Sequence, residues 1–329
     1  MKRVSRRELL KRGALGLAGV AAGTSVVQAA ARGAHVDPHA VMSGGMPADP
    51  GIDPVRFLTA FDTGVVSRRL DGRTVREYRI TAVDRTIEIM PGLQYAAWAF
   101  NGQVPGPTLR CTEGDLVRVH FTNAGSHEHT IHFHGFHAAD MDGVFEPVLP
   151  GKSFVYEFEA SPFGLQLYHC HTMPLKRHIA KGLYGAFIID PKRPRPPAHE
   201  MVMVMNGFDV NFDGENEVYA ANTVPFAYQI HPIVLRRGEL NRIYLVNVLE
   251  FDLLNSLHIH ANFFHLYRTG TTLAPQDFTD TISMGQGERH ILEFTYERTG
   301  RFMFHAHQSE FAELGWMGVF DVRNERESA

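Results

Sequence analysis

The segment Tyr168-His169-Cys170-His171 places three metal-binding side chains in a row. Alternate side chains of an extended strand point to opposite faces, so we expect His169 and His171 to project to one side and Cys170 to the other. A thiolate held back to back with two imidazoles can bind one metal on each face. The short covalent path between these side chains would then join the two metals. This arrangement predicts electron transfer between metal sites.

Histidine is unusually frequent in the chain, with 19 residues against two cysteines. Histidine is also the commonest metal ligand among side chains. Eight of these histidines form His-x-His pairs, each of which presents two imidazoles on one face of a strand: His132/His134, His169/His171, His258/His260 and His305/His307. A mononuclear zinc site needs only three or four ligands. The set is better suited to a cluster of about three metals.

Residues on the strand face opposite the His-x-His pairs predict a second kind of metal site. His129 lies an odd number of residues before His132, so in an extended strand it faces away from the cluster, as Cys170 does. His178 follows Cys170 and precedes Leu183. A His, Cys, His set with a weak or absent axial ligand is the trigonal arrangement of blue copper sites. Leucine at the axial position would leave the reduction potential high.

Different residues could take some of these roles. Met173 and Met141 are further candidates for an axial donor. His127 forms a fifth His-x-His with His129 and could replace it as a ligand. Cys111 could form a disulfide with Cys170 in an oxidising compartment, although Cys111 is better interpreted as a buried small apolar residue.

The N-terminal residues are interpreted as a targeting signal rather than as part of the fold. Arg6-Arg7 and the small-residue run "ALGLAGVAAGTSVVQAAA" predict a twin-arginine export signal over residues 1–31. We therefore expect a periplasmic or secreted protein. An uncleaved anchor is the alternative, but the run is short and rich in Ala and Gly. We expect no span in the mature chain, and a net charge of −4 argues against nucleic acid as partner.

The rest of the chain predicts an all-β fold of two tandem β-sandwich domains. Residues 32–64 are expected to form an irregular arm. Short β-type runs follow over 65–190, a proline-dense linker over 191–199 and a second set of runs over 200–329. The two sets look alike, since "FEASPFGLQLYHCH" compares with "FTYERTGRFMFHAH". The comparison predicts a duplication in which Cys170 of the first domain corresponds to Ala306 of the second.

The motifs resemble one family of enzymes. "AFNGQVPGPTLRCTEGD", "HTIHFHG", "YHCH", "LHIHANFFH" and "FHAHQSEFAELGWMG" are similar to motifs of the multicopper oxidases, and specifically of their two-domain, trimeric branch. The resemblance implies two cupredoxin-like Greek-key domains, four coppers per chain and a homotrimer with copper clusters between subunits. It also implies ligands: type 1 copper by His129, Cys170 and His178 beside Leu183, type 2 by His132 and His258, and the type 3 pair by His134, His169, His171, His260, His305 and His307.

The predicted function is oxidation of a small reducing substrate coupled to reduction of dioxygen to water, as in laccases. The substrate would be a phenol, an aromatic amine or a metal ion. Copper nitrite reductase is the rival, because the loop between Cys170 and His178 resembles the one in that family. The nitrite reductases have an aspartate where this chain has His132, and eight imidazoles suit the oxidase better. Copper storage is a third hypothesis, but storage needs no Cys–His path.

Reduction of dioxygen also consumes protons, so carboxylates should lie near the cluster. The candidates are Asp142, Asp280 and Glu310. Asp142 and Asp280 occupy equivalent places in the two halves. Each of the three could instead be a loop or capping carboxylate.

Overall fold

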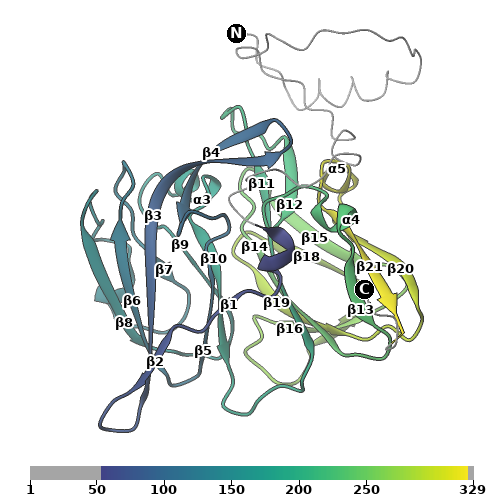
Figure 1. Cartoon of the computed structure of the whole chain (residues 1–329), viewed down its shortest axis with the longest axis horizontal. Helices are drawn as coiled ribbons and strands as arrows, with labels where there is room; N and C mark the ends of the chain where they lie inside the picture. The colour runs from purple at the N-terminus through teal and green to yellow at the C-terminus, as the bar shows by residue number, and fades with distance from the viewer. Residues whose placement is uncertain (1–52, 325–329) are drawn as a thin grey trace.

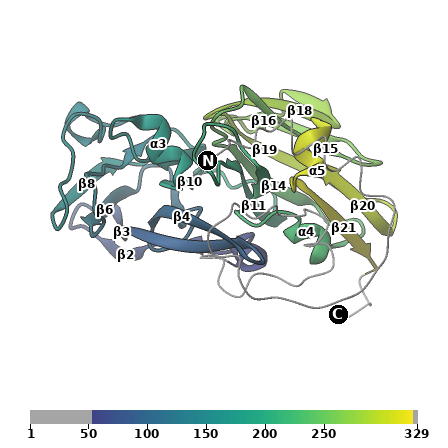
Figure 2. The ribbon, with the colours of Figure 1, turned by 90° about the horizontal axis from the view of Figure 1, so that it is seen from above.

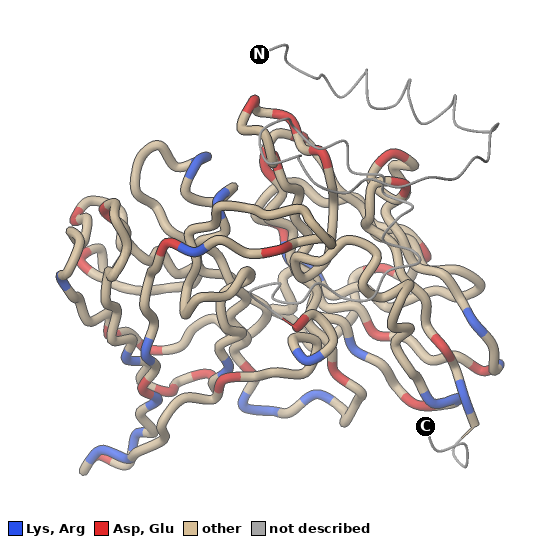
Figure 3. Tube along the Cα trace, turned by 45° about the horizontal axis from the view of Figure 1, so that its top comes forward, with Lys and Arg blue, Asp and Glu red and all other residues tan. Residues whose placement is uncertain are grey.

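The computed structural model describes residues 53–324. The predicted export signal and most of the expected arm lie outside the described residues. Two β-sandwiches stand side by side (Figures 1 and 2), which confirms the predicted all-β fold with two tandem sandwiches. Acidic and basic positions are interspersed over both sandwiches (Figure 3). No helix among residues 53–324 is long and apolar enough to cross a membrane.

The first sandwich consists of two sheets. One sheet has the strand order β2 (Val65–Arg68), β3 (Thr74–Met90), β6 (Leu116–Asn123), β8 (Ser153–Glu159), with β4 (Leu93–Phe100) paired to β3. The other has the order β1 (Phe61–Asp62), β5 (Thr108–Thr112), β10 (Tyr184–Asp190), β9 (Gly164–His169), β7 (His132–Phe133). Apolar and polar residues alternate along these strands: Val117, Val119 and Phe121 of β6 are buried, while Arg118 and His120 between them are partly exposed.

The second sandwich repeats this plan. Its first sheet has the order β12 (Val218–Ala221), β11 (His199–Phe208), β14 (Asn241–Asn247), β19 (Arg289–Phe294), β16 (Phe264–Arg268), β17 (Asp277–Thr279). Its second sheet has the order β13 (Ile233–Arg236), β21 (Met317–Arg323), β20 (Gly300–His305), β15 (Leu254–Ile259), β18 (Thr281–Gly285). The helices are short: α2 (Pro54–Phe57), α3 (Leu175–Ala180), α4 (Ala227–Ile230), α5 (Ser309–Glu313) and the 3-10 turn η2 (Ala139–Met141).

The described end of the arm is ordered rather than irregular, which corrects the prediction for residues 53–64. The Asp53 side chain accepts hydrogen bonds from the backbone N–H groups of Val55 and Arg56 and so caps α2. Phe57 and Leu58 are then buried in two different hydrophobic clusters. Burial of these two apolar side chains fixes the segment against both sandwiches.

The two sandwiches share a hydrophobic core. Leu167 and Ile188 of the first sandwich belong to the same buried cluster as Val202 and Val246 of the second. Ile179 of α3 joins this cluster as well. An apolar interface of this kind argues for a fixed relation between domains rather than a hinge.

Candidate metal centres

His129, Cys170 and His178 form a buried group in the first sandwich. The Cys170 Sγ lies 3.2 Å from His178 Nδ1 and 3.8 Å from His129 Nδ1, and the two Nδ1 atoms are 3.2 Å apart. The Thr130 N–H also points at the Cys170 Sγ, at 3.4 Å. Both imidazoles therefore present the same ring nitrogen to one sulfur.

The protonation states of this group suit a metal. Burial lowers the pKa of His129 and of His178 to about 4, so both rings are neutral at neutral pH. Burial raises the pKa of the Cys170 thiol. A bound cation would offset the cost of burying the thiolate in such a place. Two neutral imidazoles and one thiolate are the donors of a trigonal copper site, so the residues fit the predicted type 1 centre.

Leu183 remains the axial candidate. It is fully buried, its carbonyl accepts the Cys170 N–H at 2.9 Å and its own N–H donates to the His178 carbonyl at 3.3 Å. The two candidate thioethers point elsewhere. Met173 is 74% exposed, and the Met141 Sδ accepts the Glu157 N–H at 3.3 Å.

Neither His127 nor a disulfide belongs to this site. The ring of His127 is exposed and packs on Trp98 rather than on Cys170, with its Nδ1 2.8 Å from the Ser126 hydroxyl. Cys111 and Cys170 are both free and buried, so a disulfide between them is wrong. Burial raises the pKa of Cys111, which packs in the core of the first sandwich as expected.

The histidine pairs of the first domain converge on the other face. β7 pairs with β9 so that His132 lies opposite His169. The Nε2 atoms of His134 and His169 are 3.2 Å apart, and the ring of His171 is 5.4 Å from that of His132. Strand β9 ends at His169, earlier than the sequence predicted, but Cys170 still turns away from its two neighbours.

The second domain repeats this group. β15 pairs with β20 so that His258 lies opposite His305, in the register of His132 and His169. The Nε2 atoms of His260 and His305 are 2.9 Å apart, and the His307 ring is 5.5 Å from that of His258. Four histidines thus gather in each domain.

Backbone carbonyls orient these rings identically in the two domains. The Nδ1–H groups of His169 and His305 donate to the carbonyls of the next residues, Cys170 and Ala306, at 2.9 and 2.7 Å. Each of these bonds holds a proton on Nδ1 and leaves the Nε2 lone pair free for a metal. Burial lowers the pKa of His134 to about 3 and of His169 to about 4. The neutral rings fit a metal cluster.

The two groups do not meet within one chain. Among residues 53–324, the sets of histidine atoms close enough to share a metal fall within one domain or the other. The first-domain group borders a cavity of about 300 Å³ whose other wall is formed by Val248, Gln286 and Gly287 of the second domain. That cavity offers room for a small molecule beside the imidazoles.

Two of the predicted carboxylates contact the histidine groups. Asp142 accepts the His132 Nδ1–H with its backbone carbonyl at 2.8 Å and has a carboxylate oxygen 3.1 Å from the same nitrogen. Asp280 accepts the His258 Nδ1–H with its carbonyl at 3.0 Å, and its carboxylate is 3.9 Å away. Glu310 is partly buried in α5, close in sequence to His307. Asp142 and Asp280 therefore make equivalent contacts with His132 and His258 in the two domains.

Sequence reasoning missed Trp98 of β4. Its indole lies 4.7 Å from the His178 ring and 5.4 Å from the His129 ring, between centroids, and is 6% exposed. The available signal was its position just before the "AFNGQVPGP" motif, in a chain with only two tryptophans.

Comparison with known proteins identifies the family. Two multicopper oxidase family models match the chain, over residues 81–194 and 194–326. A multicopper oxidase of known crystal structure is 56% identical, with a TM-score of 0.83 over 84% of this chain and 98% of that one. The chain belongs to the multicopper oxidase family, as its motifs predicted, and is an oxidoreductase with cupredoxin-like domains. The family implies copper, which the donor sets fit.

More distant relatives include both oxidases and nitrite reductases. The blue copper oxidase of Nitrosomonas europaea is 28% identical, with a TM-score of 0.69 over 75% of this chain and 86% of that one. The copper-containing nitrite reductase of Neisseria meningitidis is 27% identical over 248 residues, which is 68% of this chain and 63% of the relative. The chain thus spans slightly less than two thirds of the length of the first curated relatives that it matches.

Proposed function

We propose that this protein oxidises a small reducing substrate in one-electron steps and uses dioxygen as the final acceptor. Its ligands would hold four coppers per chain: one at His129, Cys170 and His178, and three in a cluster that takes four histidines from each domain. Copper in these sites would supply the one-electron chemistry and the reduction of dioxygen to water. The observation that carries the proposal is the repetition of one histidine geometry in both domains, with a buried thiol directly behind the histidines of the first.

The chain's own residues have definite tasks in this proposal. Cys170 links the two sites because it is bonded covalently to His169 and His171. The carbonyls of Asp142 and Asp280 hold protons on His132 Nδ1 and His258 Nδ1. The carboxylates of the same aspartates lie beside these nitrogens and can carry protons toward the cluster.

A complete cluster requires more than one copy of the chain. In the single chain His307 is exposed and the other three second-domain histidines are partly exposed, and large exposed apolar side chains lie close in sequence to both groups. Phe136 and Phe145 follow the first pair of the first domain in sequence, and Phe263 and Met303 flank pairs of the second. Apolar side chains in such a position indicate an interface. A head-to-tail contact between first and second domains closes by rotation into a ring, and we propose a homotrimer.

Nitrite reduction is the second candidate function, because the first curated relatives are copper-containing nitrite reductases. The eight-histidine set favours the oxidase. The export motif at Arg6-Arg7 supports a periplasmic or secreted location.

One experiment separates the candidate functions. Copper per chain is measured by mass spectrometry, and oxygen uptake with a phenolic donor is followed in parallel with nitrite turnover. Four coppers with oxygen uptake support the oxidase. Two coppers with nitrite turnover support the reductase, and bound copper without either turnover supports storage. Dilution to monomers should remove copper from the cluster but leave it at Cys170.

A further inference from the structure

The cavity of about 300 Å³ beside the first-domain histidines has one polar wall besides the imidazoles. Most of its remaining lining is apolar and carries no group that could hold or pass a proton. Gln286 is the exception among the described residues that line it, and its side chain is exposed, so this wall reaches solvent. The other non-histidine lining residues are Leu167, Leu175, Ile179, Val248 and Gly287.

A carboxyl group lies directly behind this wall. The Gln286 side-chain amide donates a hydrogen bond to the carboxylate of Glu250. The backbone holds the two segments together, because the Gly287 N–H donates to the Asn247 carbonyl at 2.8 Å and the Asn247 N–H donates to the Glu288 carbonyl at 2.9 Å. The Gln286 amide carries two N–H donors, so the second can hold a water molecule in the cavity.

The surroundings of Glu250 suit a group that gains and loses protons. Its side chain is partly exposed, and burial raises its pKa against the opposing effects of the Gln286 amide and the Lys176 ammonium. A carboxyl group whose pKa is closer to neutral transfers protons more effectively at neutral pH. Lys176 of α3 also lies over the Phe251 ring at 4.2 Å. Three further charged side chains of these segments are bonded to other groups: Asp252, Glu288 and Arg289.

Asp142 approaches the histidines from a different direction. Its carboxylate oxygen lies 3.1 Å from His132 Nδ1, the nitrogen that is already bonded to the Asp142 carbonyl. Among the described residues, those that line the cavity include Gln286 but not Asp142. A proton that enters beside Gln286 therefore reaches the cavity itself, whereas one at Asp142 reaches the far nitrogen of a ring.

We propose that Glu250 and Gln286 form a proton entry of the cavity, in which Glu250 takes protons from solvent and passes them through water held by the Gln286 amide to the space beside the first-domain histidines. The proposal rests on the function proposed above and adds a residue to its proton supply. Each dioxygen reduced to two waters takes up four electrons from the donor and four protons. Glu250 gives up one proton at a time and regains it from solvent, so it is unchanged overall.

The first test needs neither turnover nor copper. Infrared spectra of the full-length copper-free protein are recorded across the acidic and neutral pH range for the wild type and Glu250→Gln. The difference between them should contain the carbonyl stretch of a protonated carboxyl group, and this band should persist above the ordinary pKa of glutamate. A band that disappears at the ordinary pKa or below it would overturn the assignment of Glu250 as the proton carrier.

Proton delivery is tested on the copper-loaded protein in two half-reactions. Anaerobic reduction of the blue centre by a donor should be unchanged in Glu250→Gln. Reoxidation of the reduced protein by dioxygen at neutral pH should be slower by about tenfold or more, because proton supply becomes limiting. The solvent isotope effect in deuterium oxide should rise as well, which a purely structural role would not produce. Glu250→Asp should restore part of the rate because it keeps an acid.

The pH profile gives a separate readout. Reoxidation of the wild type should slow as the pH rises through the pKa of Glu250, since the protonated form is the donor, and Glu250→Gln should lack this decline. Glu297→Gln is the matched control, because it removes an exposed carboxylate of the second domain and should keep the wild-type profile. Copper per chain is measured for every variant, and rates are expressed per filled chain.

Gln286→Leu tests whether the two residues act as one path. It removes the amide and keeps a similar volume, and it should slow reoxidation about as much as Glu250→Gln. The double variant should be no slower than either single variant, because losses within one path do not add. Additive losses would show that the residues act separately and would overturn the path.

The outcomes distinguish this proposal from the proposed function. A wild-type reoxidation rate, pH profile and isotope effect in Glu250→Gln would refute the proton entry and leave the oxidase in place. A fully copper-loaded wild type that takes up no dioxygen would instead refute the oxidase.

Discussion

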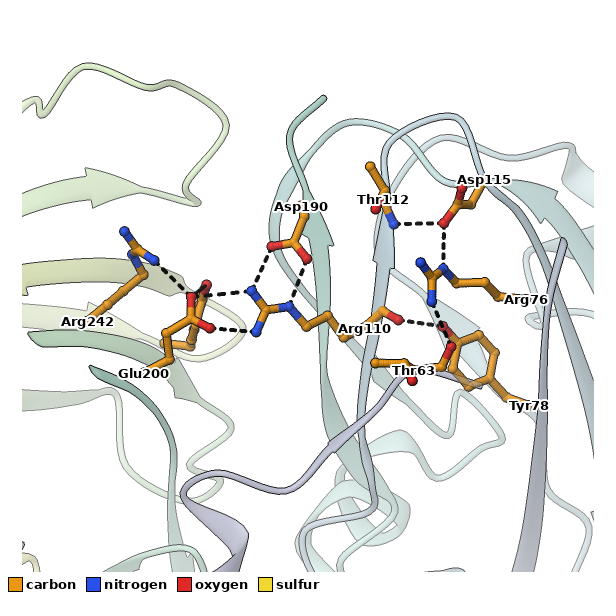
Figure 4. A network of polar contacts seen from close by, with 10 residues as sticks. Thr63, Arg76, Tyr78, Arg110, Thr112, Asp115, Asp190, Glu200 and Arg242 are labelled. Atoms are coloured by element: carbon orange, nitrogen blue, oxygen red, sulfur yellow. Dashed lines mark hydrogen bonds and ion pairs between the residues drawn. The ribbon is translucent and has the colours of Figure 1, made fainter. Parts of the chain in front are cut away.

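Glu200, the second residue of β11, should be the most sensitive position of the contact between the two domains. Its carboxylate accepts hydrogen bonds from Arg110 of the first domain at 2.6 Å and from Arg242 of the second at 2.8 Å (Figure 4). It also accepts a hydrogen bond from the Tyr244 hydroxyl of the second domain at 2.7 Å. Burial opposes ionisation, but these donors outweigh it and lower the pKa of Glu200. The Glu200 side chain is 19% exposed and that of Arg242 only 3%.

Glu200→Gln keeps the shape of the side chain and removes its charge. Breaking a buried ion pair costs about 3–5 kcal/mol. Arg110 still pairs with Asp190 and Arg242 with Glu293, so we expect a loss of about 2–3 kcal/mol. For a protein of this size, that corresponds to a fall in Tm of roughly 3–5 °C.

A surface pair provides the matched control. The Glu157 carboxylate lies 2.6 Å from Arg118, but its side chain is 40% exposed. Glu157→Gln should therefore cost less than about 1 kcal/mol. Both variants are compared with the wild type by calorimetry and urea denaturation. Equal losses in the two variants would refute the reasoning that the network stabilises the contact between domains.

Leu183→Met should lower the type 1 reduction potential, because a thioether can then donate to the cupric ion. Spectroelectrochemistry measures the shift. An unchanged potential would mean that Leu183 is not the axial residue. Gly143→Ala should reduce copper in the cluster and destabilise the fold by more than about 2 kcal/mol. The reason is that φ is +69° at Gly143 and the added Cβ would lie 2.0 Å from the Ile131 carbonyl oxygen. Gly151→Ala is the control and should leave the copper content unchanged, because Gly151 has a similar φ of +76° but no atom within 4 Å of the added Cβ. Burial raises the pKa of Glu217 to about 7, so its contribution to stability is present below about pH 4.5 and lost as pH rises through about 7. Glu217→Gln should therefore stabilise the protein by about 1 kcal/mol at pH 8 and by much less at pH 5, and urea denaturation that shows the same difference at both pH values would contradict this.

The sequence predicted the parts of the site that depend on strand periodicity. A period of two decides which side chains share a face, so Cys170 could be assigned to the side opposite His169 and His171. The duplication extended the prediction to the second domain, where His258 and His305 occupy the register of His132 and His169.

Contacts between distant elements could not be predicted in this way. Trp98 reaches His178 because β4 and α3 pack together, and Glu200 reaches Arg110 across the domain border. Local patterns carry no information on either approach. The order in residues 53–64 was missed for the same reason, since it depends on the burial of Phe57 and Leu58 against strands far away in sequence.

The most direct test of the account is the copper content of the wild type and of Cys170→Ser, measured per chain together with the blue absorbance. We expect four coppers and a blue protein in the wild type, and three coppers without the blue absorbance in the variant. A wild type that binds only two coppers when fully loaded, or a variant that stays blue, would contradict it.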